Sequence, residues 1–211
     1  MTKFKDLNAT PIIIAAPSGA GKTSLVNEVC KTLKNISVSI SHTTRVKRQN
    51  EVDGLNYHFI PQSQFTEMIN NDEFLEYAKV FGHYYGTSYA KVLQQLNQGI
   101  DVIFEIDWQG AQQIKQTFTE CLTIFILPPS LQVLRQRLLK RGMDDTKTID
   151  VRMQQARDEI SHVKEFDYLI INDDFAKSAE QMLAIIQANR LRLERQLYEN
   201  KALILPMLKH D

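Results

Sequence analysis

Short apolar runs alternate along this chain with longer stretches that have a helical spacing. The runs and alternating segments typical of strands lie at 12–14, 37–41, 101–106, 119–127 and 168–171. The stretches between them repeat apolar residues every three or four positions, as helices with one buried face do, over 22–33, 88–98, 131–138 and from about 148 and 178. Strands that alternate with helices in this way predict an α/β fold with a parallel sheet.

A loop with two glycines joins the first predicted strand to the first predicted helix. Its residues are Ala16, Pro17, Ser18, Gly19, Ala20, Gly21, Lys22, Thr23 and Ser24. They match the P-loop pattern G-x-x-x-x-G-K-[ST], except that Ala16 replaces the first glycine. Backbone N–H groups would hold phosphate oxygens, Lys22 would reach the β- and γ-phosphates, and the Thr23 hydroxyl would face a magnesium ion. The motif predicts a bound nucleoside triphosphate and leaves the reaction open.

Composition limits the classes of partner. The chain has 211 residues, 43% of them hydrophobic, which suits one α/β domain with room for an insertion. Lys and Arg balance Asp and Glu at 25 each, so no overall charge draws the protein to nucleic acid or to a membrane. No apolar run reaches the ~18 residues of a membrane helix, and the first residues lack a signal core. We expect a cytoplasmic protein that binds neither nucleic acid nor membranes.

The cysteines and histidines show no metal-binding pattern. Cys30 and Cys121 have neither the spacing of metal ligands nor that of a disulfide framework, so we expect buried, reduced thiols. The five histidines are scattered, at positions 42, 58, 83, 162 and 210. We therefore expect a metal only as magnesium that binds together with the nucleotide.

A polar, turn-rich block interrupts the α/β pattern at 43–87. It carries three cations and then short predicted elements, namely Arg45, Lys47 and Arg48 followed by 57–60, 62–71 and 73–80. Cations in a loop are, by themselves, typical of a solvated surface. The tyrosines at 57, 84 and 85 favour a phosphate site, because hydroxyls and arginine forks together suit a phosphate monoester. We predict an acceptor-binding lobe at 43–87, inserted between core segments 1–42 and 88–211.

Further candidate residues lie beyond this lobe. The strand at 101–106 ends in carboxylates at 105 and 107, at the sheet edge where open α/β folds bind ligands. Two helices joined by a short polar link predict a lid at about 137–160, with three arginines off the apolar stripes, Arg137, Arg141 and Arg152. The helix from 178 should cover the sheet with Met182, Ile186, Leu193 and Leu197. The apolar tail at 203–208 suits packing either on the body or on a second subunit.

Several motifs together are similar to those of bacterial guanylate kinases. Besides the P-loop they are the segment 39–59, Glu73-Phe74-Leu75-Glu76, Tyr84-Tyr85-Gly86-Thr87 and Glu105-Ile106-Asp107-Trp108-Gln109-Gly110. The similarity extends from about residue 11 to the helix after Asn172, with the motifs in family order and spacing. Two residues depart from the family's Arg-x-Pro-Arg-x-Gly-Glu segment, since Lys47 replaces the proline and Asn50 the glycine.

The resemblance implies a fold and a reaction. The fold is a P-loop NTPase-type three-layer sandwich with a parallel core sheet, a small mixed lobe and a helical lid. The reaction is transfer of the γ-phosphoryl group of ATP to GMP, and to dGMP, with magnesium. Matching positions imply catalytic roles for Lys22, Arg137, Arg141 and Arg152, and contact with ATP for Asn172. They imply GMP binding by Ser41, Arg45, Arg48, Glu51, Tyr57, Glu76, Tyr85, Thr87 and Asp107.

The role implied for Glu76 agrees with the chemistry of guanine. Guanine presents two adjacent donors, N1–H and the N2 amine, and the two oxygens of one carboxylate can accept both. Two alternatives stay open: a non-catalytic module that binds phosphorylated peptides, and a P-loop kinase of another phosphorylated acceptor. Retention of Gly21, Lys22 and Thr23 favours the enzyme over the module, and Glu76 with Asp107 favours guanine. The sequence leaves the oligomeric state and the effects of Lys47 and Asn50 open.

Overall fold

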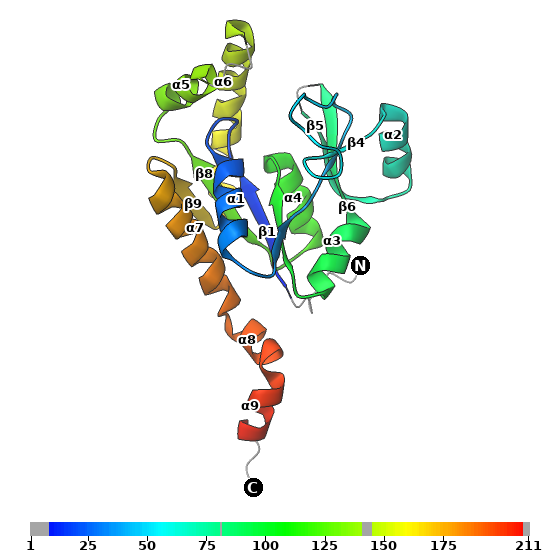
Figure 1. Cartoon of the computed structure of the whole chain (residues 1–211), viewed down its shortest axis with the longest axis vertical. Helices are drawn as coiled ribbons and strands as arrows, with labels where there is room; N and C mark the ends of the chain where they lie inside the picture. The colour runs from blue at the N-terminus through cyan, green and yellow to red at the C-terminus, as the bar shows by residue number, and fades with distance from the viewer. Residues whose placement is uncertain (1–8, 81, 141–144, 209–211) are drawn as a thin grey trace.

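A five-stranded parallel sheet forms the centre of the protein (Figure 1). This computed structural model describes residues 9–80, 82–140 and 145–208. The strand order is β2-β7-β1-β8-β9, for β1 (Pro11–Ala15), β2 (Ile36–Val38), β7 (Asp101–Glu105), β8 (Leu122–Leu127) and β9 (Tyr168–Ile171). Because β1 pairs with β7 on one side and β8 on the other, all five of its residues are buried. The predicted parallel sheet is confirmed.

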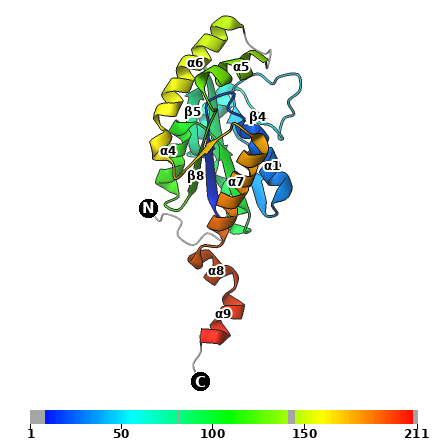
Figure 2. The same cartoon turned by 90° about the vertical axis from the view of Figure 1, so that its left-hand side faces the viewer.

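Helices cover both faces of this sheet and make three layers (Figure 2). On one face, α1 (Lys22–Thr32) and α7 (Phe175–Arg190) pack Leu25 and Met182 against Ile12 and Ile14. On the other face lie α3 (Tyr89–Asn97) and α4 (Trp108–Thr117), whose buried side chains include Val92, Leu96 and Ile114. Cys30 packs against the first cluster and Cys121 against the second, so the two thiols lie on opposite faces; both are free and half-buried.

The pattern of apolar residues did not indicate α4. This helix buries only Gly110, Ala111 and Ile114, and most of its remaining residues are polar. Its start is defined by Asp107, whose carboxylate accepts a hydrogen bond from the Gly110 N–H at 2.9 Å. Trp108 packs by stacking on His162, with the ring centroids 3.7 Å apart.

A second sheet, with four strands, occupies the block between the core segments. Its order is β4-β3-β6-β5, for β3 (His42–Thr43), β4 (His58–Phe59), β5 (Phe74–Val80) and β6 (His83–Ser88). Helix α2 (Gln62–Asn70) packs Phe65 on Phe74, with ring centroids 4.5 Å apart. Strand β6 was not predicted, because His83 to Ser88 contains no aliphatic residue; its pairing with β5 and β3 makes it one of the two inner strands of this sheet.

Two helices lie beside the P-loop, in the range that was predicted to form a lid. They are α5 (Leu131–Lys140) and α6 (Thr146–Ser161), and their shared core consists of Leu134, Leu138, Ile149 and Ala156. Asp145 caps α6 by accepting a hydrogen bond from the Thr148 N–H at 2.7 Å. The short 3₁₀ segment Val163–Glu165 leads from α6 back to β9.

The prediction of one long C-terminal helical stripe was wrong. Helix α7 ends at Arg190, and α8 (Leu193–Glu199) and α9 (Lys201–Leu208) extend away from the sheet (Figure 1). Met182 and Ile186 are buried, whereas Leu193 is 72% exposed. The side chains of Arg190 and Arg195, on either side of the break, converge on the buried Asp101 at 2.7 and 2.8 Å.

The apolar tail does not pack on the body. Leu203, Leu205, Met207 and Leu208 are all exposed on α9. Leu197 on α8 is exposed as well, which corrects its expected place on the sheet. Within the described ranges, no helix combines the length and apolar character needed to cross a membrane.

Candidate functional site

The P-loop forms a backbone turn at the carboxyl end of β1. Gly19 and Gly21 have φ angles of 94° and 97°, a conformation that a residue with a side chain adopts only under strain. A Cβ on Gly21 would lie 2.4 Å from Nδ2 of Asn172, and one on Gly19 would lie 3.0 Å from Leu138. Both glycines are therefore required by conformation and by close neighbours. Ala16, which replaces the first motif glycine, has a negative φ and needs no glycine.

Asn172 stabilises the P-loop through a hydrogen bond of its side chain. It is 4% exposed at the end of β9, and its Nδ2 donates to the Ala20 carbonyl at 2.7 Å. Its backbone N–H donates to the Leu127 carbonyl, which fixes it to the neighbouring strand. The structure thus brings Asn172 to the predicted triphosphate loop, where its side chain supports the backbone turn.

The first turn of α1 presents hydrogen-bond donors at the P-loop. It contains no acidic residue and no side chain caps it, so its N–H groups face the loop that should hold an anion. Lys22 extends from this turn across to β7, where its Nζ donates to the Ile106 carbonyl at 3.1 Å. Thr23 and Ser24 are exposed beside it.

Two of the three predicted lid arginines point at the P-loop. Arg137 donates to the Asn172 carbonyl at 2.9 Å and approaches the Ala20 carbonyl at 3.5 Å. Arg152 on α6 donates to Oγ of Ser18 at 3.0 Å. The third, Arg141, lies outside the described residues. Helices α5 and α6 therefore each bring one guanidinium group to the P-loop.

A second group of site residues lies on the four-stranded sheet. Arg45 makes a bidentate ion pair with Glu51, at 3.0 and 2.7 Å, which raises the pKa of Arg45 and lowers that of Glu51. The Arg45 guanidinium lies 5.5 Å from the centre of the Tyr57 ring, and the rings of Tyr57 and Tyr85 are 5.8 Å apart. Glu51 also accepts from the backbone N–H of Arg48. Glu51 therefore organises the loop that carries the arginines.

A chain of hydroxyls leads to a buried carboxylate at the other end of this sheet. Thr87 Oγ1 donates to Oε1 of Glu76 at 2.6 Å, and the Ser41 hydroxyl lies 3.2 Å from Thr87 Oγ1. Since Thr87 has one hydroxyl proton, Ser41 donates the second bond. Glu76 is 3% exposed, and burial, with a smaller effect of Asp107, raises its pKa to about 7. Three of the side chains predicted to bind GMP, Ser41, Thr87 and Glu76, thus form one network.

The two groups meet at Ile106 and Asp107. The Ile106 carbonyl holds Lys22, and Asp107 follows it directly. The Asp107 charge acts on Glu76, so the two carboxylates lie near one another. One oxygen of Asp107 caps α4, a structural role that its expected ligand role did not include.

One residue near the site was missed in the sequence. Burial raises the pKa of Glu159, on α6, to about 7, and the charges of Lys22 and Asp107 both act on it. It is half-buried. The sequence feature that could have identified Glu159 is its spacing from Arg152. Seven residues make two helical turns, so both side chains lie on one face of the helix.

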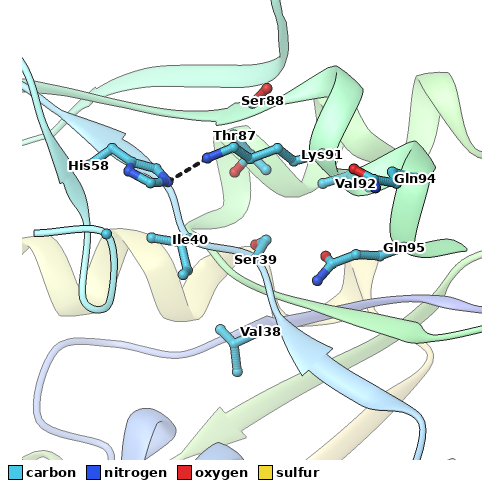
Figure 3. Close-up of a pocket in the computed structure, with 11 residues that line it drawn as sticks. Val38, Ser39, Ile40, His58, Thr87, Ser88, Lys91, Val92, Gln94 and Gln95 are labelled. Carbon is cyan, nitrogen blue, oxygen red and sulfur yellow. Dashed lines mark hydrogen bonds between the residues drawn. The ribbon is translucent and has the colours of Figure 1, made fainter.

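A separate pocket of about 310 Å³ lies where the second sheet joins the core (Figure 3). Its walls include Ser39 and Ile40 of the connection after β2, and Gln95 of α3. Lys91 of α3 donates to Nε2 of His58 of β4 at 2.9 Å across it. Burial and the Lys91 charge lower the pKa of His58, which keeps its ring neutral as the acceptor. This hydrogen bond ties the second sheet to the core.

Comparisons with known proteins agree with this geometry. A family model described as Guanylate kinase matches residues 8–189. A guanylate kinase of Pseudomonas fluorescens (strain Pf0-1) is 54% identical over 187 residues, 89% of this chain and 91% of that protein. One of Legionella pneumophila (strain Paris) is 49% identical over 192 residues, 91% and 92% of the two chains. The crystal structure of guanylate kinase from Anaplasma phagocytophilum has a TM-score of 0.79 at 29% identity and covers 98% of this chain and 99% of its own. The resemblance and the expected fold are confirmed.

Proposed function

Because this chain belongs to the guanylate kinase family, it transfers the γ-phosphoryl group of ATP to GMP, and we propose which of its residues do so. The observation that carries the assignment is the junction at Ile106 and Asp107. There the P-loop lysine, held by the Ile106 carbonyl, comes next to Asp107, whose charge acts on Glu76. Phosphoryl donor and acceptor would thus meet at one sheet edge.

The donor side of the site is formed by the P-loop and the lid. The backbone of 16–21 and the first turn of α1, with Lys22, Thr23 and Ser24, would hold the phosphates of ATP. Asn172 supports this loop through the Ala20 carbonyl. Arg137 and Arg152 already contact loop atoms and would turn to the transferring phosphoryl group, and Arg141 would join them.

The acceptor side is the lobe at 43–87 with Asp107. Arg45, Arg48, Tyr57 and Tyr85 would bind the GMP phosphate, with Glu51 holding Arg45 in place. Glu76 would accept the two guanine donors, with Ser41, Thr87 and Asp107 completing the base contacts. Adenine would offer this carboxylate a lone pair in place of a proton, so AMP should be rejected by roughly 10⁴-fold.

Transfer in this site needs no general base. The second pKa of a phosphate monoester is about 6, so the attacking oxygen of GMP is already anionic at pH 7. The protein aligns the two nucleotides and neutralises charge on the phosphoryl group with Lys22 and the lid arginines. Closure of the lobe and of the lid at 137–160 would exclude water, which otherwise competes with GMP as acceptor.

The residues near the P-loop fit a magnesium ion bound with ATP. Thr23 exposes a hydroxyl, and Glu105 at the end of β7 has a buried Oε1 with no hydrogen-bond partner among the described residues. Mg²⁺ prefers such oxygen ligands, shared with substrate phosphates. Thr23 and Glu105 would hold the ion, which when bound neutralises negative charge on the phosphates.

A coupled ADP-release assay tests the assignment. Purified protein with ATP and magnesium is assayed against GMP, dGMP, AMP, CMP and UMP, with Lys22→Ala as the blank. We expect turnover with the guanine nucleotides alone and none in the blank. Equal turnover by Lys22→Ala, or equal use of AMP, would contradict the proposed site.

A further inference from the structure

Gly110 lies against the carboxylate of Glu76. A Cβ built on Gly110 would lie 2.8 Å from Oε2 of Glu76 and 3.3 Å from its Cδ. Real Cβ atoms essentially never approach a neighbour within 3.0 Å, so a side chain here would force the carboxylate to move. Glu76 is buried and has little room in which to shift.

The backbone does not explain why this position is glycine. Gly110 lies within α4 and is not among the residues with positive φ. Glycine in a helix costs up to about 1 kcal/mol relative to alanine, an upper bound for a residue in the first turn such as Gly110. This glycine weakens its own helix and has no positive φ that would require it. Its presence therefore indicates that a side chain at this position would not fit.

The same residue also holds the other base-binding carboxylate. The Gly110 N–H donates to Oδ1 of Asp107 at 2.9 Å. Glu76 Oε1 is bound by Thr87, so the oxygen that faces Gly110 is the second one, Oε2. Gly110 therefore lies beside one oxygen of each carboxylate.

We propose that Gly110 is a positioning residue for guanine recognition, which gives Glu76 the space to keep Oε2 directed at the base and anchors Asp107 beside it. The inference rests on the guanine-binding role proposed for these carboxylates. A methyl group at position 110 displaces Oε2 and breaks the two-point match with the N1–H and N2 donors. Misplacement on the scale of 1 Å costs up to about 10²-fold in such sites.

The test is Gly110→Ala, assayed for GMP, AMP and ATP kinetics and for thermal unfolding. We expect the KM for GMP to rise about 10- to 100-fold and the preference over AMP to fall, with the KM for ATP unchanged. The melting temperature should stay equal or rise, because alanine favours the helix. Gln116→Ala, an exposed substitution on the same helix, should leave all these values unchanged.

A double-mutant cycle with Glu76→Ala separates positioning from general damage. Once the carboxylate is absent, adding Gly110→Ala should not raise the KM for GMP further. A wild-type KM in Gly110→Ala, a lower melting temperature with a raised KM for ATP, or an equal loss in the Glu76→Ala background would each overturn the inference. If Glu76→Ala itself keeps full GMP preference, the proposed role of Glu76 fails instead, so the two failures are distinguishable.

Discussion

The Thr87 hydroxyl donates to Oε1 of Glu76 at 2.6 Å inside the protein. The two residues lie on adjacent antiparallel strands and face each other in the register of β5 and β6. The bond stabilises the ionised carboxylate, while burial opposes ionisation and prevails, since the pKa of Glu76 is raised to about 7. Thr87 therefore fixes where one carboxylate oxygen lies and offsets part of the effect of burial on the pKa of Glu76.

Thr87→Val should weaken GMP binding. Valine keeps the shape but leaves Oε1 of Glu76 without its donor, and an unpaired buried acceptor costs about 1–3 kcal/mol. We expect the KM for GMP to rise about 10- to 100-fold in steady-state assays, with the KM for ATP unchanged. Thr87→Ser retains the hydroxyl and serves as the control; equal KM values for the two variants would refute the prediction.

Use of GMP should depend on the ionisation of Glu76. Only the carboxylate accepts from both guanine donors, so kcat/KM for GMP should rise with pH up to about 7 and then level off. In Glu76→Gln the rise of kcat/KM with a midpoint near pH 7 should be absent. Only the rise due to ionisation of the GMP phosphate should remain, near pH 6, since the second pKa of that phosphate is about 6. If a rise of kcat/KM with a midpoint near pH 7 persists in Glu76→Gln, that rise belongs to another group, such as Glu159.

Two arginines on α5 should behave differently. Arg137 contacts carbonyls at the P-loop, whereas Arg135, two residues earlier, makes an exposed ion pair with Asp150 at 2.6 Å. Arg137→Ala should lower kcat by about 10³-fold with little change in the KM for ATP, as expected for a charge that acts on the transferring group. Arg135→Ala should stay within about twofold of the wild type, because exposed pairs contribute little. Equal kcat values in the two variants would contradict the proposed role of Arg137 at the transferring phosphoryl group.

Glu51→Gln should weaken binding of the GMP phosphate by the acceptor lobe. The Arg45 and Glu51 side chains are 13% and 16% exposed and share two charge-assisted hydrogen bonds, which the neutral amide weakens. We expect the KM for GMP to rise about tenfold, with kcat less affected. Glu67→Gln, exposed on α2 of the same lobe, is the matched control. An unchanged KM in Glu51→Gln would show that Arg45 needs no such partner.

The sequence by itself determined the features that depend on near neighbours along the chain. The strand, loop and helix of the P-loop, the parallel core strands and the paired lid helices each follow from local spacing and turn chemistry. Motif matching located the carboxylate and arginine positions, and the structure brings Ser41, Thr87 and Glu76 into one network.

Only the tertiary structure decided the features that depend on residues distant in sequence. Strand β6 has no aliphatic run and is defined by its partners on both sides, and α4 is defined by a cap and a narrow buried face. The residues on either side of the helix break before Leu193, Arg190 and Arg195, both bind Asp101, which is about 90 positions away. The clearance between Gly110 and Glu76 likewise joins two segments that no local pattern relates, because packing acts through space and not along the chain.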